Sequence, residues 1–409
     1  MTPFRSVAFR QLWGSSLASS SAQGMERTAT AWLALEAGGG AFAVGLVFAA
    51  RMLPSLLLGL VAGTVADRAG RSRQLLAVAL AGLVIMSSFS WLIQAGPLYA
   101  WQPVAFSFVF GCLQVFDTPA RQTLVTDTVP ADSAVRALAL NALAGRLAMA
   151  GGALIAGALI PAFGVARCYL AIAAAYGIGG LILSRLRVDR REHGTVARPP
   201  FVHALREAGR LIVAVPAVRT LSIAGIACEI FAFSHGSALP IMAHDVLAVG
   251  AAGLGALNAA AAIGGTVAVA LLAALPGHIR RQPLMGAVFV CYGLALLALA
   301  SARSLPVAIA IMAVTGLCAG AFDLLQQTLI QLAVPEAQRG RAVGVWMLGL
   351  GSAPVGHLEM GALVAAIGAP GGLLINGSLT LLSSALLLVR APNYRWATKQ
   401  RADAALRAE

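Results

Sequence analysis

The feature that most constrains the fold of this chain is a succession of apolar runs separated by short polar turns. A helix needs about 20 apolar residues to cross the hydrocarbon core of a bilayer. Of the 409 residues, 59% are hydrophobic and 11% are charged, whereas about a quarter of an ordinary soluble domain is charged. The sequence therefore predicts an all-α membrane protein with twelve transmembrane helices. They lie at about 11–35, 43–66, 74–95, 98–120, 136–160, 166–186, 217–241, 251–275, 283–301, 305–327, 341–366 and 370–390.

The polar intervals divide the chain into four predicted parts. Residues 1–187 form an N-terminal bundle of six helices, and residues 217–391 form a C-terminal bundle of six. Between them, 188–216 is a cytoplasmic linker. Its end alternates apolar and charged residues as a helix lying on a membrane surface does. A polar tail, 392–409, follows the last helix.

The basic residues predict the orientation of the chain. Of the 29 lysines and arginines, 24 fall on the side that holds both termini, while the opposite loops hold Arg167 and Arg303. Lys and Arg are enriched in cytoplasmic loops. Both termini are therefore expected in the cytoplasm, with the protein in a bacterial inner membrane.

The two halves of the sequence resemble one another at an offset of 205 residues. Gly111 recurs as Gly316, and Phe116-Asp117 recurs as Phe322-Asp323 with a one-residue slip. A shift of half the chain in the same direction indicates two parallel six-helix repeats, related by an axis along the membrane normal. The alternative explanation is a chance similarity between apolar helices. The matches count against it because they include polar and turn residues.

Composition and spacing also exclude several classes of protein. The net charge is +13, but the basic residues form small clusters between apolar runs and not a stripe with interleaved aromatic residues, so we expect no nucleic-acid binding. The six histidines form no cluster with metal-ligand spacing, and no glycine-rich phosphate loop is present. We therefore expect no cofactor, no metal, no ATP-driven transport and no enzyme activity.

A charged turn between the second and third runs carries the most specific motif. It reads Gly63-x-x-x-Asp67-Arg68-x-Gly70-Arg71, and it resembles the loop signature of major facilitator superfamily transporters. The resemblance implies a latch that holds the two halves together on the cytoplasmic side. In this latch Asp67 faces the start of the eleventh helix and Arg71 pairs with Asp117. Asp323 and Gln326 are expected to face the central cavity, or Asp323 instead marks the inner gate of the second half by analogy with Asp117. The alternative is that the arginines of this turn only set the topology.

Further short motifs narrow the resemblance. These motifs are Phe9-Arg10-x-Leu12-Trp13, Pro54, Pro119-x-x-Gln122 and Pro354-Val355-Gly356. They resemble motifs of the branch of the superfamily that includes enterobactin exporters and secondary-metabolite effluxers. The Gly-Pro pair of many drug–proton antiporters is missing from the fifth helix. The resemblance implies export of a siderophore or similar small molecule by proton antiport, from a protein that is monomeric in the bilayer.

Charged and polar residues inside the spans are the candidates for binding a substrate or a proton, because each such charge costs about 2.5–3.5 kcal/mol on insertion scales. Glu26 and Glu229 are the leading proton sites, since burial favours the neutral form of a carboxyl group. Structural roles stay open: Glu26 pairing with Arg27 or Arg51, Glu359 near the outer water, and His235 as a core histidine. The candidates are Glu26, Arg27, Arg146, Glu229, His235, Gln326 and Glu359.

Three functions stay open at this point. Proton-coupled export of a small organic molecule is the leading one, and proton-coupled uptake uses the same architecture. A membrane enzyme is the third, and the missing catalytic clusters disfavour it.

Overall fold

The structure, a computed structural model, describes residues 3–186, 201–276 and 279–390. For residues 56, 57, 59–69, 131, 201–205, 337, 389 and 390 it describes the backbone alone. These residues form helices and turns, without a strand among them. The helices of the first half are α1 (Val7–Glu36), α2 (Gly40–Ala69), α3 (Arg71–Ala95), α4 (Trp101–Asp127), α5 (Ala134–Phe163) and α6 (Val165–Ser184). The predicted boundaries at 187–188 and 391–392 lie outside the described residues.

The second half begins with α7 (Phe201–Ala214), at the position where a surface helix is predicted. The seventh span of the chain, the first of this half, is broken into five pieces. They are α8 (Pro216–Ala227), a π turn (Cys228–Ala232), a 3-10 turn (Phe233–Ser237), α9 (Leu239–Ile241) and a second π turn (Met242–Val246). The remaining helices are α10 (Gly250–Ala274), α11 (Arg281–Ala300), α12 (Leu305–Leu332), α13 (Arg339–Leu350) and α14 (Ala353–Arg390).

Twelve spans can be traced along these elements, as the sequence predicts. Nine helices in the described part of the chain are long and apolar enough to cross a membrane. The first span, α1, is too polar to be counted among them, and α2 contributes a shorter apolar helix at Gly40–Ser55. The apolar stretch from α13 through α14 holds two spans, because Gly368 breaks α14 with a φ of 78°.

Close helix packing repeats between the halves. Gly111 of α4 lies against the backbone carbonyl of Arg51 in α2, and Gly316 of α12 lies against the carbonyl of Ala261 in α10. A side chain at either glycine would overlap the neighbouring helix. Small residues of this kind let helices approach closely in lipid, where burying a large apolar side chain gains little. The matching contacts support the parallel six-helix repeat.

The turn between α2 and α3 depends on one glycine. Gly70 ends α2 and begins α3 with a φ of 83°, a left-handed conformation that residues with a Cβ adopt with strain. The predicted tight turn of the loop motif is therefore present in the backbone.

The two halves touch at one end of the bundle, which we call the closed end. There, α2 crosses α14 and α5 crosses α10, both at glycines. A Cβ on Gly45 would lie 2.6 Å from the carbonyl oxygen of His357, and a Cβ on Gly157 would lie 3.2 Å from the Cα of Gly255. These backbone contacts leave no room for a passage through the closed end.

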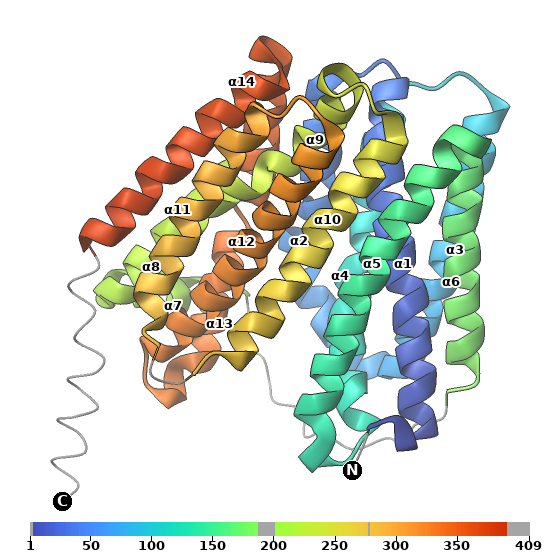
Figure 1. Ribbon diagram of the computed structural model, residues 1–409. Coiled ribbons are helices and arrows are strands. Elements are labelled where there is room, and N and C mark those ends of the chain that lie inside the picture. Colours follow the sequence, from blue (N-terminus) through green and yellow to red (C-terminus); the bar gives the residue numbers. More distant parts are fainter. Residues whose placement is uncertain (1–2, 187–200, 277–278, 391–409) are drawn as a thin grey trace, which may run out of the picture.

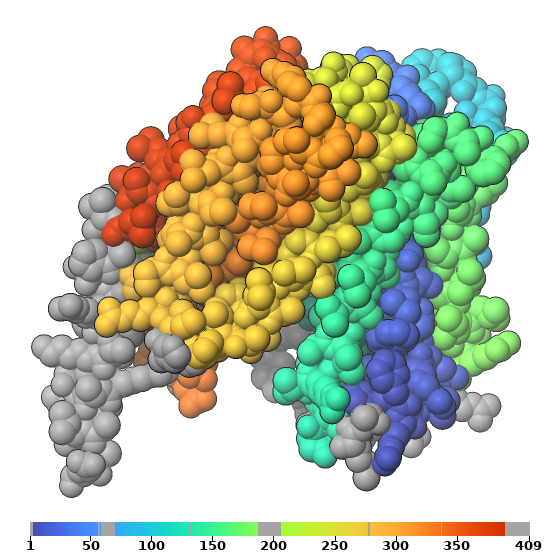
Figure 2. Space-filling model, viewed as in Figure 1, coloured from blue at the N-terminus to red at the C-terminus, as the bar shows by residue number. Residues whose placement is uncertain are grey.

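At the opposite end, which carries the N terminus, the halves separate. In Figure 1 the helices of the first half, blue to green, diverge downward from those of the second half, yellow to red. Figure 2 shows a hollow between them at this end, which we call the open end. The fold thus forms a V of two bundles around a central space.

Candidate functional site

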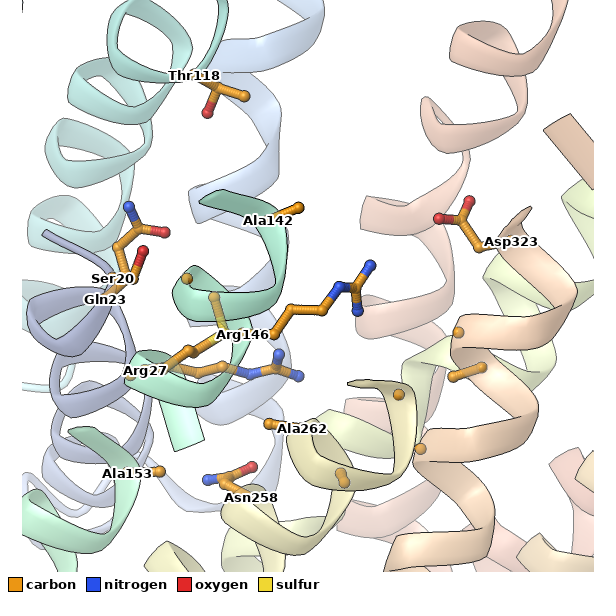
Figure 3. Close-up of a pocket in the computed structure, with 18 of the residues that line it drawn as sticks. Ser20, Gln23, Arg27, Thr118, Ala142, Arg146, Ala153, Asn258, Ala262 and Asp323 are labelled. Atoms are coloured by element: carbon orange, nitrogen blue, oxygen red, sulfur yellow. The ribbon is translucent and has the colours of Figure 1, made fainter. Parts of the chain in front are cut away.

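A cavity of about 1040 Å³ lies between the two halves. Helices α1, α4 and α5 line one side, and the broken seventh span, α10 and α12 line the other. Figure 3 shows polar side chains pointing into it from both halves. The charged or polar residues of the lining include Ser16, Ser20, Gln23, Arg27, Asp117, Thr118, Arg121, Gln122, Asn141, Arg146, His235, Asn258 and Asp323. Such a site can bind a polar molecule of considerable size.

Asp117 and Arg121 form a buried ion pair on α4. The Nε of Arg121 donates to Oδ2 of Asp117 at 2.9 Å, and Nη2 donates to Oδ1 at 2.7 Å. Arg121 also donates to the hydroxyls of three serines on α1, at 3.0–3.4 Å, which are Ser15, Ser16 and Ser19. A guanidinium satisfied in this way holds α4 against α1 with charge-assisted hydrogen bonds.

Arg121 is a site residue that the sequence analysis missed. The signal was present, because an Asp followed four residues later by an Arg places both on one helix face. The two residues also stand inside a span, where an unpaired charge would be costly.

The expected pairing of Arg71 with Asp117 is wrong in this structure. Arg71 instead donates to Oδ2 of Asp127 at 2.8 Å, which lies at the end of α4. The physical reason is position along the helix: Asp117 lies almost three turns deeper and is already held by Arg121. Gly63, Asp67 and Arg68 lie where only the backbone is described, so the latch they were assigned to stays a prediction.

Glu26 lies behind the cavity lining, not in it. Its side chain is fully buried and forms an ion pair with Arg51 of α2. Thr30 donates to Glu26 Oε1 at 3.0 Å, and the guanidinium of Arg51 packs on the ring of Phe110 at 4.6 Å. The structure thus contains the pairing with Arg51 that was one of the open alternatives for Glu26.

Two arginines of the first half enter the cavity without an ion pair among the described residues. Arg27 of α1 packs its guanidinium over the ring of Phe48 at 5.6 Å. Arg146 of α5 reaches across toward α10, where its Nη1 would lie 3.4 Å from a Cβ on Gly265. In Figure 3, Arg146 and Asp323 point toward one another from opposite sides.

Two acids of the second half also lack an ion pair among the described residues. Asp323 of α12 lines the cavity and accepts a hydrogen bond from Nε1 of Trp346 at 3.2 Å. Glu229 lies in the π turn of the seventh span, close enough to Asp323 for the two to interact electrostatically. π turns inside helices occur frequently at functional sites.

The remaining candidates, His235, Gln326 and Glu359, each have a hydrogen-bond partner, and His235 lies in the cavity lining. His235 lines the cavity, with its Nδ1 2.7 Å from the carbonyl of Ala232. Gln326 does not reach the cavity, because it donates to the carbonyl of Leu221 at 3.1 Å and so ties α12 to α8. Glu359 accepts from Asn376 at 3.0 Å within α14. The expectation that Gln326 faces the central cavity is therefore wrong.

Comparison with known proteins gives a consistent result. A family model described as "Transmembrane secretion effector" matches residues 1–406. The chain is 28% identical over 408 residues to the multidrug efflux pump Tap of Mycobacterium tuberculosis (strain ATCC 25618 / H37Rv), covering 96% of this chain and 94% of the relative. It is 22% identical over 339 residues to the staphyloferrin A transporter of Staphylococcus aureus (strain NCTC 8325 / PS 47), covering 80% of this chain and 82% of the relative.

Solved structures show the same fold at low sequence identity. The nucleoside transporter NupG superposes with a TM-score of 0.75 at 12% identity, covering 94% of this chain and 99% of NupG. A bacterial homologue of the lysosomal transporter Spinster, solved in an inward-facing and unoccupied conformation, superposes with a TM-score of 0.70 at 16% identity, covering 96% and 97%. The predicted major facilitator fold is confirmed.

Proposed function

Because this chain belongs to the transmembrane secretion effector family of major facilitator transporters, we propose that it exports a small organic molecule, a siderophore or a similar metabolite or drug, in exchange for protons. The observation that carries the proposal is the cavity shared by both halves, which is open at one end of the bundle and blocked by backbone contacts at the other. The two curated relatives, an efflux pump and a siderophore transporter, favour this class of substrate.

Alternating access follows from that shape. We propose that the open end faces the cytoplasm, in agreement with the basic residues on the side of the termini. A substrate then enters from the cytoplasm, the bundles rock about the cavity, and the glycine contacts at Gly45 and Gly157 separate to release it outside. The Asp67 turn, which lies at the open end, would close against the second half in that state.

Proton coupling in this proposal belongs to the second half. Asp323 lines the cavity, and Glu229 is close enough to Asp323 for the two to interact electrostatically; neither forms an ion pair among the described residues. Glu26, by contrast, is held by Arg51. A proton that moves down 100 mV supplies about 2.3 kcal/mol, which is enough to sustain a gradient of about fifty-fold in an exported molecule.

Transport into inside-out membrane vesicles tests the proposal. The probes are a carboxylate siderophore, a catecholate siderophore and the cationic dye ethidium, each added outside the vesicles. We expect a vesicle interior that is more acidic than the medium to drive accumulation of at least one probe, and an uncoupler to abolish it. Accumulation under the reverse gradient alone would show proton-coupled uptake instead. Accumulation that survives the uncoupler would contradict proton coupling.

A further inference from the structure

Positive and negative side chains line the cavity in unequal numbers, and some of them are paired while others are not. Among the residues that the structure describes, the lining holds three arginines, Arg27, Arg121 and Arg146, against two aspartates, Asp117 and Asp323. Asp117 and Arg121 neutralise one another in a buried pair with two hydrogen bonds. Two arginines and one aspartate therefore remain to interact with whatever occupies the cavity.

Arg27 has no counter-ion near its guanidinium among the described residues. The carboxylate next to it in sequence, Glu26, turns away from the cavity and pairs with Arg51. What surrounds Arg27 is neutral or aromatic: the face of Phe48, the backbone at Gly236, and the imidazole of His357, which stacks on Phe48. A cation held among such groups within the membrane is costly unless an anion or water approaches it.

Arg146 of the first half lies near an acidic residue of the second half. Asp323 is near enough to interact with it electrostatically, although the two form no ion pair in this structure. Figure 3 shows Arg27 and Arg146 on the same side of the cavity, and Asp323 facing them. The side formed by α1 and α5 is thus positive, and amide and hydroxyl groups such as Gln23, Asn258 and Ser20 lie around it.

We propose that the exported molecule is an anion, and that Arg27 binds its carboxylate or comparable oxyanion group while Arg146 provides the second positive contact. A guanidinium presents paired N–H donors that match the two oxygens of a carboxylate. The volume of about 1040 Å³ leaves space for a molecule much larger than the anionic group itself. This inference rests on the proposed function, because it names the chemical class of the molecule that the same cavity exports.

Arg27 also joins the cavity to the closed end. Its Nη2 would lie 3.2 Å from a Cβ on Gly236 of the second half, and Phe48 and His357, from α2 and α14, stack between the halves with ring centroids 5.1 Å apart. An anion on Arg27 therefore sits directly beneath the contacts that must separate before release.

The experiment compares compounds released by a bacterial host that carries the protein with those released by a host that carries an empty vector. Mass spectrometry of the medium identifies every compound whose release depends on the protein, and electrophoretic mobility gives its charge at neutral pH. The same measurement is made for Arg27→Gln, Arg27→Lys and the control Arg303→Gln, which changes an exposed arginine outside the cavity. Protein levels in the membrane and gel-filtration profiles show whether each variant folds.

We expect the dependent compounds to be anions. Their export should fall about tenfold or more in Arg27→Gln, the effect of losing one hydrogen-bonded charge contact. It should recover in part in Arg27→Lys and stay unchanged in Arg303→Gln. Dependent compounds that are neutral or cationic, or full export of anions by folded Arg27→Gln, would overturn the inference while export itself stands. If no compound depends on the protein, the proposed function fails, and this inference fails with it.

Discussion

Acids buried in the first half form ion pairs with arginines, whereas those in the described part of the second half form none and accept hydrogen bonds from neutral groups. In the first half, the pairs are Glu26 with Arg51, Asp117 with Arg121, and Asp127 with Arg71. In the described part of the second half, Asp323 accepts from Trp346 and Glu359 accepts from Asn376. The ion pairs found there each include an exposed side chain, as in Arg341 with Glu207 and Arg339 with Glu336.

The repeat makes the contrast specific to one position. At the offset of 205 residues, Arg121 of α4 corresponds to Gln326 of α12. Arg121 holds the nearby Asp117, but Gln326 donates to the backbone of α8, and Asp323 forms no ion pair among the described residues. The fold therefore holds Asp117 of the first half in an ion pair, whereas Asp323 of the second half forms none among the described residues. We propose that the first half serves as a scaffold and that the second half responds to protons.

The largest effect that this contrast predicts is on stability, at Glu26. Glu26→Gln leaves Arg51 buried beside Phe110 without its anion, and breaking a buried pair in this way costs about 3–5 kcal/mol. The free energy of unfolding, measured by SDS titration in mixed micelles, should fall by that amount.

The double variant Glu26→Gln with Arg51→Met provides the control. Removing both charges restores an apolar contact and should recover much of the lost stability. If Glu26→Gln unfolds at the same SDS concentration as the wild type, the pair does not stabilise the first half and the contrast between the halves is wrong.

A smaller loss is expected at Asp117. Asp117→Asn removes the charged acceptor from Arg121 but leaves the three serine hydroxyls, so the free energy of unfolding should fall by about 1.5–3 kcal/mol. The same titration measures it, with Asp323→Asn as the matched variant of the second half. A larger loss in Asp323→Asn than in Asp117→Asn would reverse the assignment of scaffold and responsive halves.

Glu229→Gln should change stability by less than about 1 kcal/mol, because the amide has the shape of the carboxyl group and no ion partner is lost. Its effect should appear in transport: proton-driven accumulation in inside-out vesicles should fall to near background, while exchange of labelled for unlabelled substrate persists. Normal proton-driven accumulation by this variant would remove Glu229 from the coupling mechanism.

The smallest effect is expected at a surface pair of the second half. Arg341 and Glu207 lie 3.1 Å apart with the Arg341 side chain 52% exposed, and exposed pairs contribute about 0–1 kcal/mol. The free energy of unfolding of Arg341→Gln should therefore differ from that of the wild type by no more than this amount. A loss comparable to that of Glu26→Gln would mean that α7 and α13 depend on this pair, and that strong ion pairing is not confined to the first half.

Much of the site could be predicted from the sequence, and the errors have one cause. Arg27, Arg146 and Asp323 were expected near the cavity because charges inside a span must face a partner or a cavity, and they line it. Arg71 was given the wrong partner, and Gln326 the wrong direction. Both errors concern which groups of neighbouring helices meet: Arg71 reaches Asp127 because Asp117 lies deeper and is held by Arg121, and Gln326 reaches the backbone of α8. Sequence spacing along one helix does not contain these contacts.

The sequence by itself determined the twelve spans, the repeat and the tight turn at Gly70, since these depend on the thickness of the bilayer and on local backbone geometry. The tertiary structure decided which buried charges are neutralised. At the offset of 205 residues, Glu26 corresponds to a position two residues from Glu229, yet Glu26 pairs with Arg51 and Glu229 forms no ion pair among the described residues. The physical reason is that an ion pair requires contact within a few ångströms, and only the packing of whole helices brings residues from distant parts of the chain that close.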